Sequence, residues 1–118
     1  MKILVCGGRD YKDETAVINF ILRLDDERPI TSIIHGGAPG ADAIGGRCAE
    51  LLKVPCQVFK ANWKKYGNAA GPIRNQKMLE EGKPDIVVAF PGGKGTADMV
   101  TRARSHGLEV IEARGIDC

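Results

Sequence analysis

The sequence predicts one α/β domain in which a mainly parallel sheet of about five strands lies between two helical layers. Three observations support this three-layer sandwich. The 118 residues match the usual size of one domain. Short apolar runs alternate with amphipathic segments along the chain, which is typical of strands joined by helical crossovers. Residues 86–90 are uninterruptedly apolar, as in a sheet covered on both faces.

Five segments are expected to be strands because they are short, apolar and followed by turn-forming or polar residues. In chain order they span residues 3–6, 31–34, 57–60, 85–90 and 109–112. The first, second and fourth are followed directly by glycine-containing loops. The expected strand order is 3-2-1-4-5, which places the first strand at the centre of the sheet.

Four segments are expected to be helices, and in the first two apolar residues recur at the spacing of one helix face. They span about 13–27, 41–53, 72–81 and 96–105. Asp13 is the expected cap of the first helix, and Pro29 marks its end. Pro72 suits the first turn of the third helix, and Gly82 ends that helix. Residues 62–71 are predicted to be a loop, and the last residues a loose tail.

Composition and charge exclude several classes of protein. The 17 basic and 15 acidic residues give a net charge of +2, too small to indicate nucleic acid or an anionic membrane as the obligatory partner. No apolar run approaches the roughly 20 residues that cross a bilayer, and the first residues are too few for a signal-peptide core, so a cytoplasmic location is expected. The four cysteines are scattered, which favours reduced thiols over a metal site. No metal and no cofactor are expected.

Glycine is the most informative residue type in this composition. Eight of the 15 glycines lie in three loops that follow predicted strands: Gly7-Gly8, Gly36-Gly37 with Gly40, and Gly92-Gly93 with Gly95. Parallel α/β sheets bind ligands outside the carboxyl ends of the strands, where the strand order reverses. The expected strand order brings all three loops to one crevice there.

These loops have the chemistry of an anion site. Glycine lets backbone N–H groups approach a ligand closely, and the helix N-termini that follow attract phosphate. The segment Pro91-Gly92-Gly93-Lys94-Gly95-Thr96 is the best single candidate for a phosphate cradle. It lacks the Gly-Lys-Ser/Thr of a P-loop, and the first loop lacks the dinucleotide fingerprint, so ATP hydrolysis and NAD-dependent redox chemistry are not expected. The alternative is that the glycines only form tight turns.

The same segments resemble the SLOG superfamily and, within it, the small YspA-like, cpYpsA-related proteins of bacteria and phages. The matching segments, in order, are Gly7-Gly8-Arg9-Asp10, His35-Gly36-Gly37-Ala38-Pro39-Gly40-Ala41-Asp42, Arg74-Asn75 with Met78, and Phe90-Pro91-Gly92-Gly93-Lys94-Gly95-Thr96-Ala97-Asp98-Met99. The resemblance implies a single Rossmann-like domain over residues 1–118 that binds a nucleotide or a nucleotide-derived small molecule. It also implies a homodimer or a higher homo-oligomer.

The superfamily includes the lonely-guy phosphoribohydrolases, which split a base from a nucleoside monophosphate. The chain is similar to them at Arg74, at Met78 and over residues 91–99, but Met99 holds the position of their catalytic glutamate. Cleavage of a glycosidic bond needs a carboxylate to stabilise the sugar cation or to activate water. A hydrolase of this kind would therefore depend on Arg74 together with Asp42, Asp98 or His35 as a replacement.

Several side chains have both a functional and a structural interpretation. Arg9 and Arg74 are the preferred phosphate contacts because a guanidinium forks onto phosphate, although either can form a surface salt bridge. Asp10 and Asp42 either contact ribose or base, or cap the helices that follow. His35 is either an acid–base group or a structural histidine. The full predicted ligand-binding set is Gly7, Gly8, Arg9, Asp10, His35, Gly36, Gly37, Gly40, Asp42, Arg74, Asn75, Pro91, Gly92, Gly93, Lys94, Gly95 and Thr96.

The leading functional hypothesis is a domain that binds a phosphate-containing nucleotide derivative and acts as a sensor, a sequestering domain or a processing domain. Hydrolysis of a nucleotide at its glycosidic bond is the enzymatic alternative. DNA binding is a third class, because the superfamily includes a DNA-uptake protein, but the chain has no basic stripe. Trp63 and Tyr66 either stack on a base or cover the sheet edge or an oligomer contact.

Overall fold

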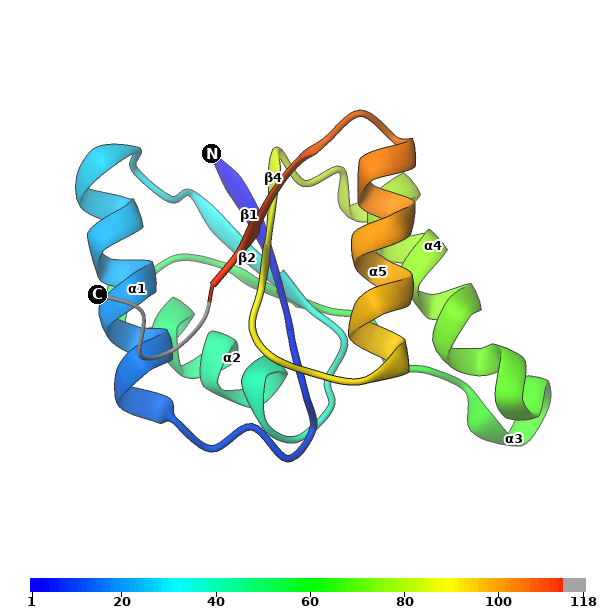
Figure 1. Cartoon of the computed structure of the whole chain (residues 1–118). Coiled ribbons are helices and arrows are strands. Elements are labelled where there is room, and N and C mark those ends of the chain that lie inside the picture. The colour runs from blue at the N-terminus through cyan, green and yellow to red at the C-terminus, as the bar shows by residue number, and fades with distance from the viewer. Residues whose placement is uncertain (114–118) are drawn as a thin grey trace.

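The fold is a five-stranded parallel sheet with helices on both faces (Figure 1). The computed structural model describes residues 1–113, so the predicted tail and Cys118 lie outside the described residues. The strands are β1 (Lys2–Cys6), β2 (Ser32–His35), β3 (Cys56–Val58), β4 (Ile86–Ala89) and β5 (Glu109–Glu112). Their order, β3-β2-β1-β4-β5, confirms the predicted order 3-2-1-4-5.

The central strand β1 pairs in parallel with both β2 and β4. Ile3 lies opposite Ile33 on one side and Ile86 on the other. The chain runs outward from β1 through β2 to β3, then returns to the other side of β1 and continues through β4 to β5. The strand order therefore reverses at β1, which is the position where doubly wound sheets hold ligands.

Two helices cover each face of the sheet. Figure 1 shows α1 (Glu14–Glu27) and α2 (Ala41–Leu52) on one face, and α4 (Ala70–Gly82) and α5 (Lys94–Ser105) on the other. Asp13 caps α1 as predicted, since its Oδ1 accepts a hydrogen bond from the amide of Ala16 at 3.1 Å. Within residues 1–113 no helix combines the length and the apolar character that a bilayer span requires.

The buried side chains of the strands alternate between the two faces of the sheet, which divides the core into two clusters. Ile3 and Val5 of β1 face α1 and α2, whereas Leu4 faces α4 and α5, because successive strand side chains point to opposite faces. All three are fully buried. Burial of one such side chain contributes about 1.5–3 kcal/mol, so both faces of β1 hold the sheet to its helical layers.

The segment expected to be a loop at residues 62–71 is mostly helical, so that prediction was wrong. It contains α3 (Trp63–Tyr66), a 3-10 turn (Gly67–Ala69) and the start of α4. Asn62 caps α3, since its Oδ1 accepts from the amide of Lys65 at 3.1 Å. Pro72 lies in the first turn of α4, where an amide would have no intrahelical acceptor, so the helix can begin before the proline.

Most strand and helix boundaries lie within one residue of expectation, and two further ones differ by two residues. β3 ends at Val58 instead of residue 60, because its partner β2 ends at His35, whose carbonyl accepts the last bond from the amide of Phe59. The helix expected from residue 96 begins at Lys94, since the amide of Ala97 donates to the carbonyl of Gly93 at 3.0 Å. Apolar periodicity misses such a first turn because it is polar.

Candidate functional site

The three glycine loops meet at the carboxyl end of β1, and Gly8 joins them. The amide of Gly8 donates to the carbonyl of Pro91 at 2.8 Å, which ties the first loop to the third. The carbonyl of Gly8 accepts from the amide of Ala41 at 3.2 Å, which ties the first loop to the second. Backbone hydrogen bonds thus bring together segments that are far apart in the sequence.

Gly40 shows why this junction needs glycine. Its φ is +77°, a conformation that L side chains rarely adopt. A Cβ at this position would also overlap the carbonyl oxygens of Gly8 and Arg9. Gly40 therefore serves the packing of the first loop against the second.

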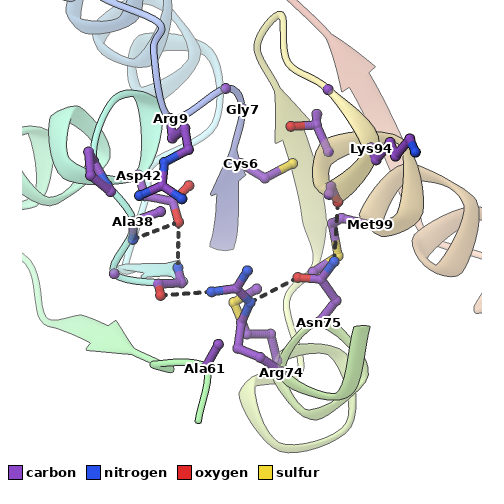
Figure 2. A pocket seen from close by; sticks show the side chains of 18 of the residues that line it. Cys6, Gly7, Arg9, Ala38, Asp42, Ala61, Arg74, Asn75, Lys94 and Met99 are labelled. Atoms are coloured by element: carbon purple, nitrogen blue, oxygen red, sulfur yellow. Dashed lines mark hydrogen bonds between the residues drawn. The ribbon is translucent and has the colours of Figure 1, made fainter. Parts of the chain in front are cut away.

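A cavity of about 550 Å³ lies between these loops, α4 and α5 (Figure 2). Twelve members of the predicted ligand-binding set line it: Gly7, Gly8, Arg9, Gly36, Gly37, Asp42, Arg74, Asn75, Gly93, Lys94, Gly95 and Thr96. The other five members, Asp10, His35, Gly40, Pro91 and Gly92, are not part of this lining. Three of these five, Gly40, Pro91 and Gly92, lie instead at the contacts between the loops.

Seven lining residues were not proposed as ligand contacts from the sequence: Cys6, Ala38, Pro39, Lys60, Ala61, Met78 and Met99. Cys6 ends β1, and Lys60 lies just after β3, so both lie at the carboxyl edge of the sheet. Their position after a predicted strand was the signal in the sequence that could have marked them as cavity residues. Met78 and Met99 come from the inner faces of α4 and α5, where burial alone explains an apolar side chain.

Asp42 organises the second loop from inside the cavity wall. Its Oδ2 accepts hydrogen bonds from the amides of Gly36 at 3.1 Å and Ala38 at 3.3 Å (Figure 2). Burial raises the pKa of Asp42, while these hydrogen bonds and the nearby Arg74 oppose that shift. The carboxyl group thus shapes the loop that precedes α2.

Arg74 extends from α4 across the cavity to the second loop. Its Nη1 donates to the carbonyl of Gly36 at 2.9 Å, and its Nε donates to Oδ1 of Asn75 at 3.0 Å (Figure 2). Within residues 1–113 its guanidinium forms no ion pair with a carboxylate. The charge is therefore held in place by neutral oxygens and is available to an anion.

Asn75 connects this arginine to the start of α5. Its side chain is buried, and its Nδ2 donates to the carbonyl of Gly95 at 3.2 Å and to Oδ2 of Asp98 at 2.9 Å. The same Asp98 oxygen accepts from Nε of Arg102 at 2.8 Å. Asp98 is therefore engaged in a network between α4 and α5, and it does not line the cavity. Its neighbour Met99, which is 1% exposed, does.

Positive charge dominates the cavity wall. The four cationic side chains in the lining are Arg9, Lys60, Arg74 and Lys94, and the one carboxylate is Asp42. In the part of the chain that the structure describes, none of these four cations forms an ion pair. Elsewhere, Arg28, Arg47, Arg102 and Arg104 each pair with a carboxylate. Four cations without an ion pair in residues 1–113 thus lie where a ligand would bind.

The Cys6 thiol at the floor of the cavity is not activated. Burial, and to a lesser extent the charge of Asp42, raise the pKa of Cys6 to about 12. A thiol with this pKa stays protonated at neutral pH and is a poor nucleophile. Among residues 1–113 there is also no cluster of three or more His, Cys, Asp or Glu residues that would hold a metal ion.

His35 faces the layer of α2 rather than the cavity. Its Nδ1 accepts a hydrogen bond from the amide of Gly37 at 3.0 Å, so this nitrogen carries no proton in the folded protein. A Cβ at Gly46 would lie 3.0 Å from Nε2, which shows how closely α2 approaches the ring. Burial lowers the pKa of His35. The histidine thus supports the second glycine loop.

We expect the stability of the protein to fall as the pH falls below the ordinary histidine pKa of 6.5. The unfolded chain takes up a proton there that the folded protein resists, because burial of the ring that accepts the Gly37 amide disfavours its charged form. The stability that neutral His35 contributes is complete above pH 6.5 and is lost as the pH approaches its lowered native pKa. Thermal melts of His35→Asn, whose amide oxygen accepts the same bond without titrating, should show a weaker pH dependence between pH 7.5 and 5.5. The control is His106→Asn, which changes the other histidine of the chain, an exposed residue at the end of α5. An unchanged slope in His35→Asn would contradict the assignment.

Comparisons with known proteins agree with this architecture. The chain matches the YspA, cpYpsA-related SLOG family over residues 1–66. It is 34% identical over 118 residues to the Gene 61 protein of Mycobacterium phage D29, covering 93% of this chain and 94% of that protein.

The crystal structure of MurG from Acinetobacter baumannii is similar in fold, with a TM-score of 0.58 and 12% sequence identity. The similarity covers 96% of this chain and 34% of that one, so the chain spans about a third of the length of MurG. At this identity the similarity concerns the fold alone, and it supports the Rossmann-like architecture expected from the sequence. With the family match over residues 1–66 and the phage relative along nearly the whole chain, this protein belongs to the YspA, cpYpsA-related SLOG family.

Proposed function

We propose that the cavity binds a nucleotide or a nucleotide-derived small molecule through its phosphate group. One observation carries this proposal: unpaired cations and backbone amides from three loops line a single cavity at the carboxyl end of β1. Family membership supports a nucleotide-related ligand. The volume of about 550 Å³ is within the range of small-molecule sites, roughly 300–1,000 Å³.

The start of α5 supplies the donors that a phosphate would use. The first amides of a helix have no intrahelical acceptor, and the helix dipole adds partial positive charge there. Lys94, Gly95 and Thr96 form this first turn and line the cavity. Arg74 adds a guanidinium from the opposite helix, and Arg9 adds a second one from the first loop.

The carboxylates favour binding over hydrolysis as the proposed activity. Among the residues that line the cavity, Asp42 is the one carboxylate, and its Oδ2 already accepts two backbone amides. Asp98 is held by Asn75 and Arg102 outside the lining. Met99 cannot stabilise a sugar cation or activate water, since a thioether is neither a base nor an anion.

The proposal is tested by titrating the purified protein with AMP, GMP, CMP, UMP and the corresponding diphosphates. We expect at least one of these nucleotides to raise the melting temperature and to give a saturable calorimetric signal. Chromatography of the same mixtures detects any released base. Its release would show that the protein hydrolyses the glycosidic bond of the nucleotide and does not only bind it. Sedimentation velocity on the same sample tests the homo-oligomer that the family resemblance implies. If no nucleotide binds at millimolar concentration, the proposal is wrong.

Gly93→Val is expected to weaken nucleotide binding while it leaves the fold nearly intact. A Cβ at Gly93 meets no atom within 4 Å, so a side chain fits without disturbing the protein. The same side chain would occupy the space where a phosphate approaches the first amides of α5. We expect at least a roughly tenfold loss of affinity by calorimetry and a stability loss of only about 1 kcal/mol at this helix-cap position.

Substitution of the neighbouring Gly92 is expected to affect stability instead. A Cβ at Gly92 would lie 2.6 Å from the amide nitrogen of Gly8 and would overlap the Thr96 hydroxyl. Gly92→Ala should therefore lower the melting temperature, because it separates the first and third loops. Unchanged nucleotide affinity in a folded Gly93→Val would show that the phosphate does not lie at this loop.

A further inference from the structure

Trp63 is the single tryptophan of the chain, and it lines the cavity. We propose that its indole is the platform on which the base of the nucleotide stacks. This inference rests on the proposed function and adds to it, because it assigns the part of the cavity that reads the non-phosphate end of the ligand.

The exposure of Trp63 is unusual for its residue type. Tryptophan is highly buried on average, yet Trp63 is 57% exposed. The nearby Tyr66 and Ile73 are also exposed, but neither lines the cavity. Trp63 is therefore the large apolar side chain of this surface that offers open area to a ligand, and every base has a face that stacks on an aromatic ring.

The backbone around Trp63 is fixed at both ends of α3. Asn62 caps α3 on one side, and on the other the amide of Gly67, at a φ of +55°, donates to the carbonyl of Trp63. A Cβ at Gly71 would contact the Trp63 ring at 3.5 Å, so the edge of the ring rests against α4. A preorganised ring binds a base with little loss of conformational entropy.

The cavity has different chemistry at its two ends. Backbone amides, Arg9 and Lys94 come from the loops after β1, β2 and β4 and from the start of α5, whereas Trp63 comes from α3. The other two cations, Lys60 after β3 and Arg74 on α4, lie on the elements that flank α3 in the chain. Figure 1 shows α3 at the outer end of α4, set apart from the loop after β1. Met78 and Met99 line the cavity with apolar, polarisable side chains. A ligand with phosphate at one end and a flat aromatic group at the other matches this distribution.

The test compares AMP, GMP, CMP and UMP with ribose 5-phosphate, which carries the sugar and phosphate without a base. Calorimetry is performed on the wild type, Trp63→Ala, Trp63→Phe and the control Tyr66→Ala, which changes an aromatic residue of the same helix outside the cavity. Since Trp63 is the single tryptophan, the intrinsic fluorescence of the wild type reports on stacking directly.

We expect Trp63→Ala to weaken the tightest of the four nucleotides roughly tenfold, the usual effect of removing a stacking partner, and to leave ribose 5-phosphate unaffected. Trp63→Phe should retain most of the affinity, Tyr66→Ala should match the wild type, and the nucleotide should quench tryptophan fluorescence. Unchanged nucleotide affinity in Trp63→Ala would show that the base does not stack on Trp63, and it would not contradict the proposed function. An equal loss for the nucleotide and ribose 5-phosphate would also overturn the platform. If neither probe binds the wild type, the proposed function fails and the platform fails with it.

Discussion

Arg74→Ala is expected to weaken nucleotide binding by roughly 30-fold or more, the loss that follows from removing a charged hydrogen-bond donor of about 2 kcal/mol. The side chain crosses the cavity, and within residues 1–113 its remaining N–H groups have no acceptor beyond Gly36 and Asn75. A phosphate would accept hydrogen bonds from these N–H groups. Removal of the guanidinium would therefore take away both a positive charge and directed hydrogen bonds to the ligand. Calorimetric titration of the variant against the wild type measures the effect.

Two further variants separate this role from a general loss of positive charge. Arg74→Lys keeps the charge but loses the planar fork, so its affinity should lie between those of the wild type and Arg74→Ala. Arg47→Ala removes an arginine that is paired with Glu14 at the surface, and its affinity should match the wild type. Equal affinities for Arg74→Ala and Arg47→Ala would mean that Arg74 does not contact the ligand.

Gly40→Ala is expected to destabilise the fold by about 3 kcal/mol or more, because it combines backbone strain with a collision. The φ of +77° disfavours any side chain, and the added Cβ would overlap two carbonyl oxygens of the first loop. These oxygens belong to rigid backbone that cannot rotate away as a side chain would. Urea unfolding of the wild type and the variant gives the difference directly.

Gly95→Ala is the matched control for this prediction. A Cβ at Gly95 meets no atom within 4 Å, and alanine is the better helix former in the first turn of α5. Its stability should equal or exceed that of the wild type. A Gly40→Ala protein as stable as Gly95→Ala would show that the junction of the first two loops adjusts without cost.

The position of the cavity was predictable because it follows from where strands end. Gly7, Gly36 and Gly92 each follow a predicted strand, and the carboxyl ends of parallel strands share one edge of a sheet. The strand order was equally predictable and is confirmed. The packing between the loops was not, since the bond from Gly8 to Pro91 joins residues that no local pattern relates.

Other features could not be predicted because they depend on tertiary contacts or on elements too short for periodicity. The helix at Trp63–Tyr66 has four residues, about one turn, so it shows no apolar repeat. Asp42 interacts with the loop before its helix, which neither of its two expected roles included. The orientation of His35 was accessible in principle, because it lies two residues after Ile33 and faces the same helical layer.

The two hydrogen bonds that join Gly8 to the second and third loops have a consequence for the proposed ligand binding. Because one residue links the loops that follow three strands, the cavity rim is held in shape by the folded chain itself. For the proposed ligand, the conformational entropy of ordering these loops would therefore be lost when the chain folds and not when the ligand binds.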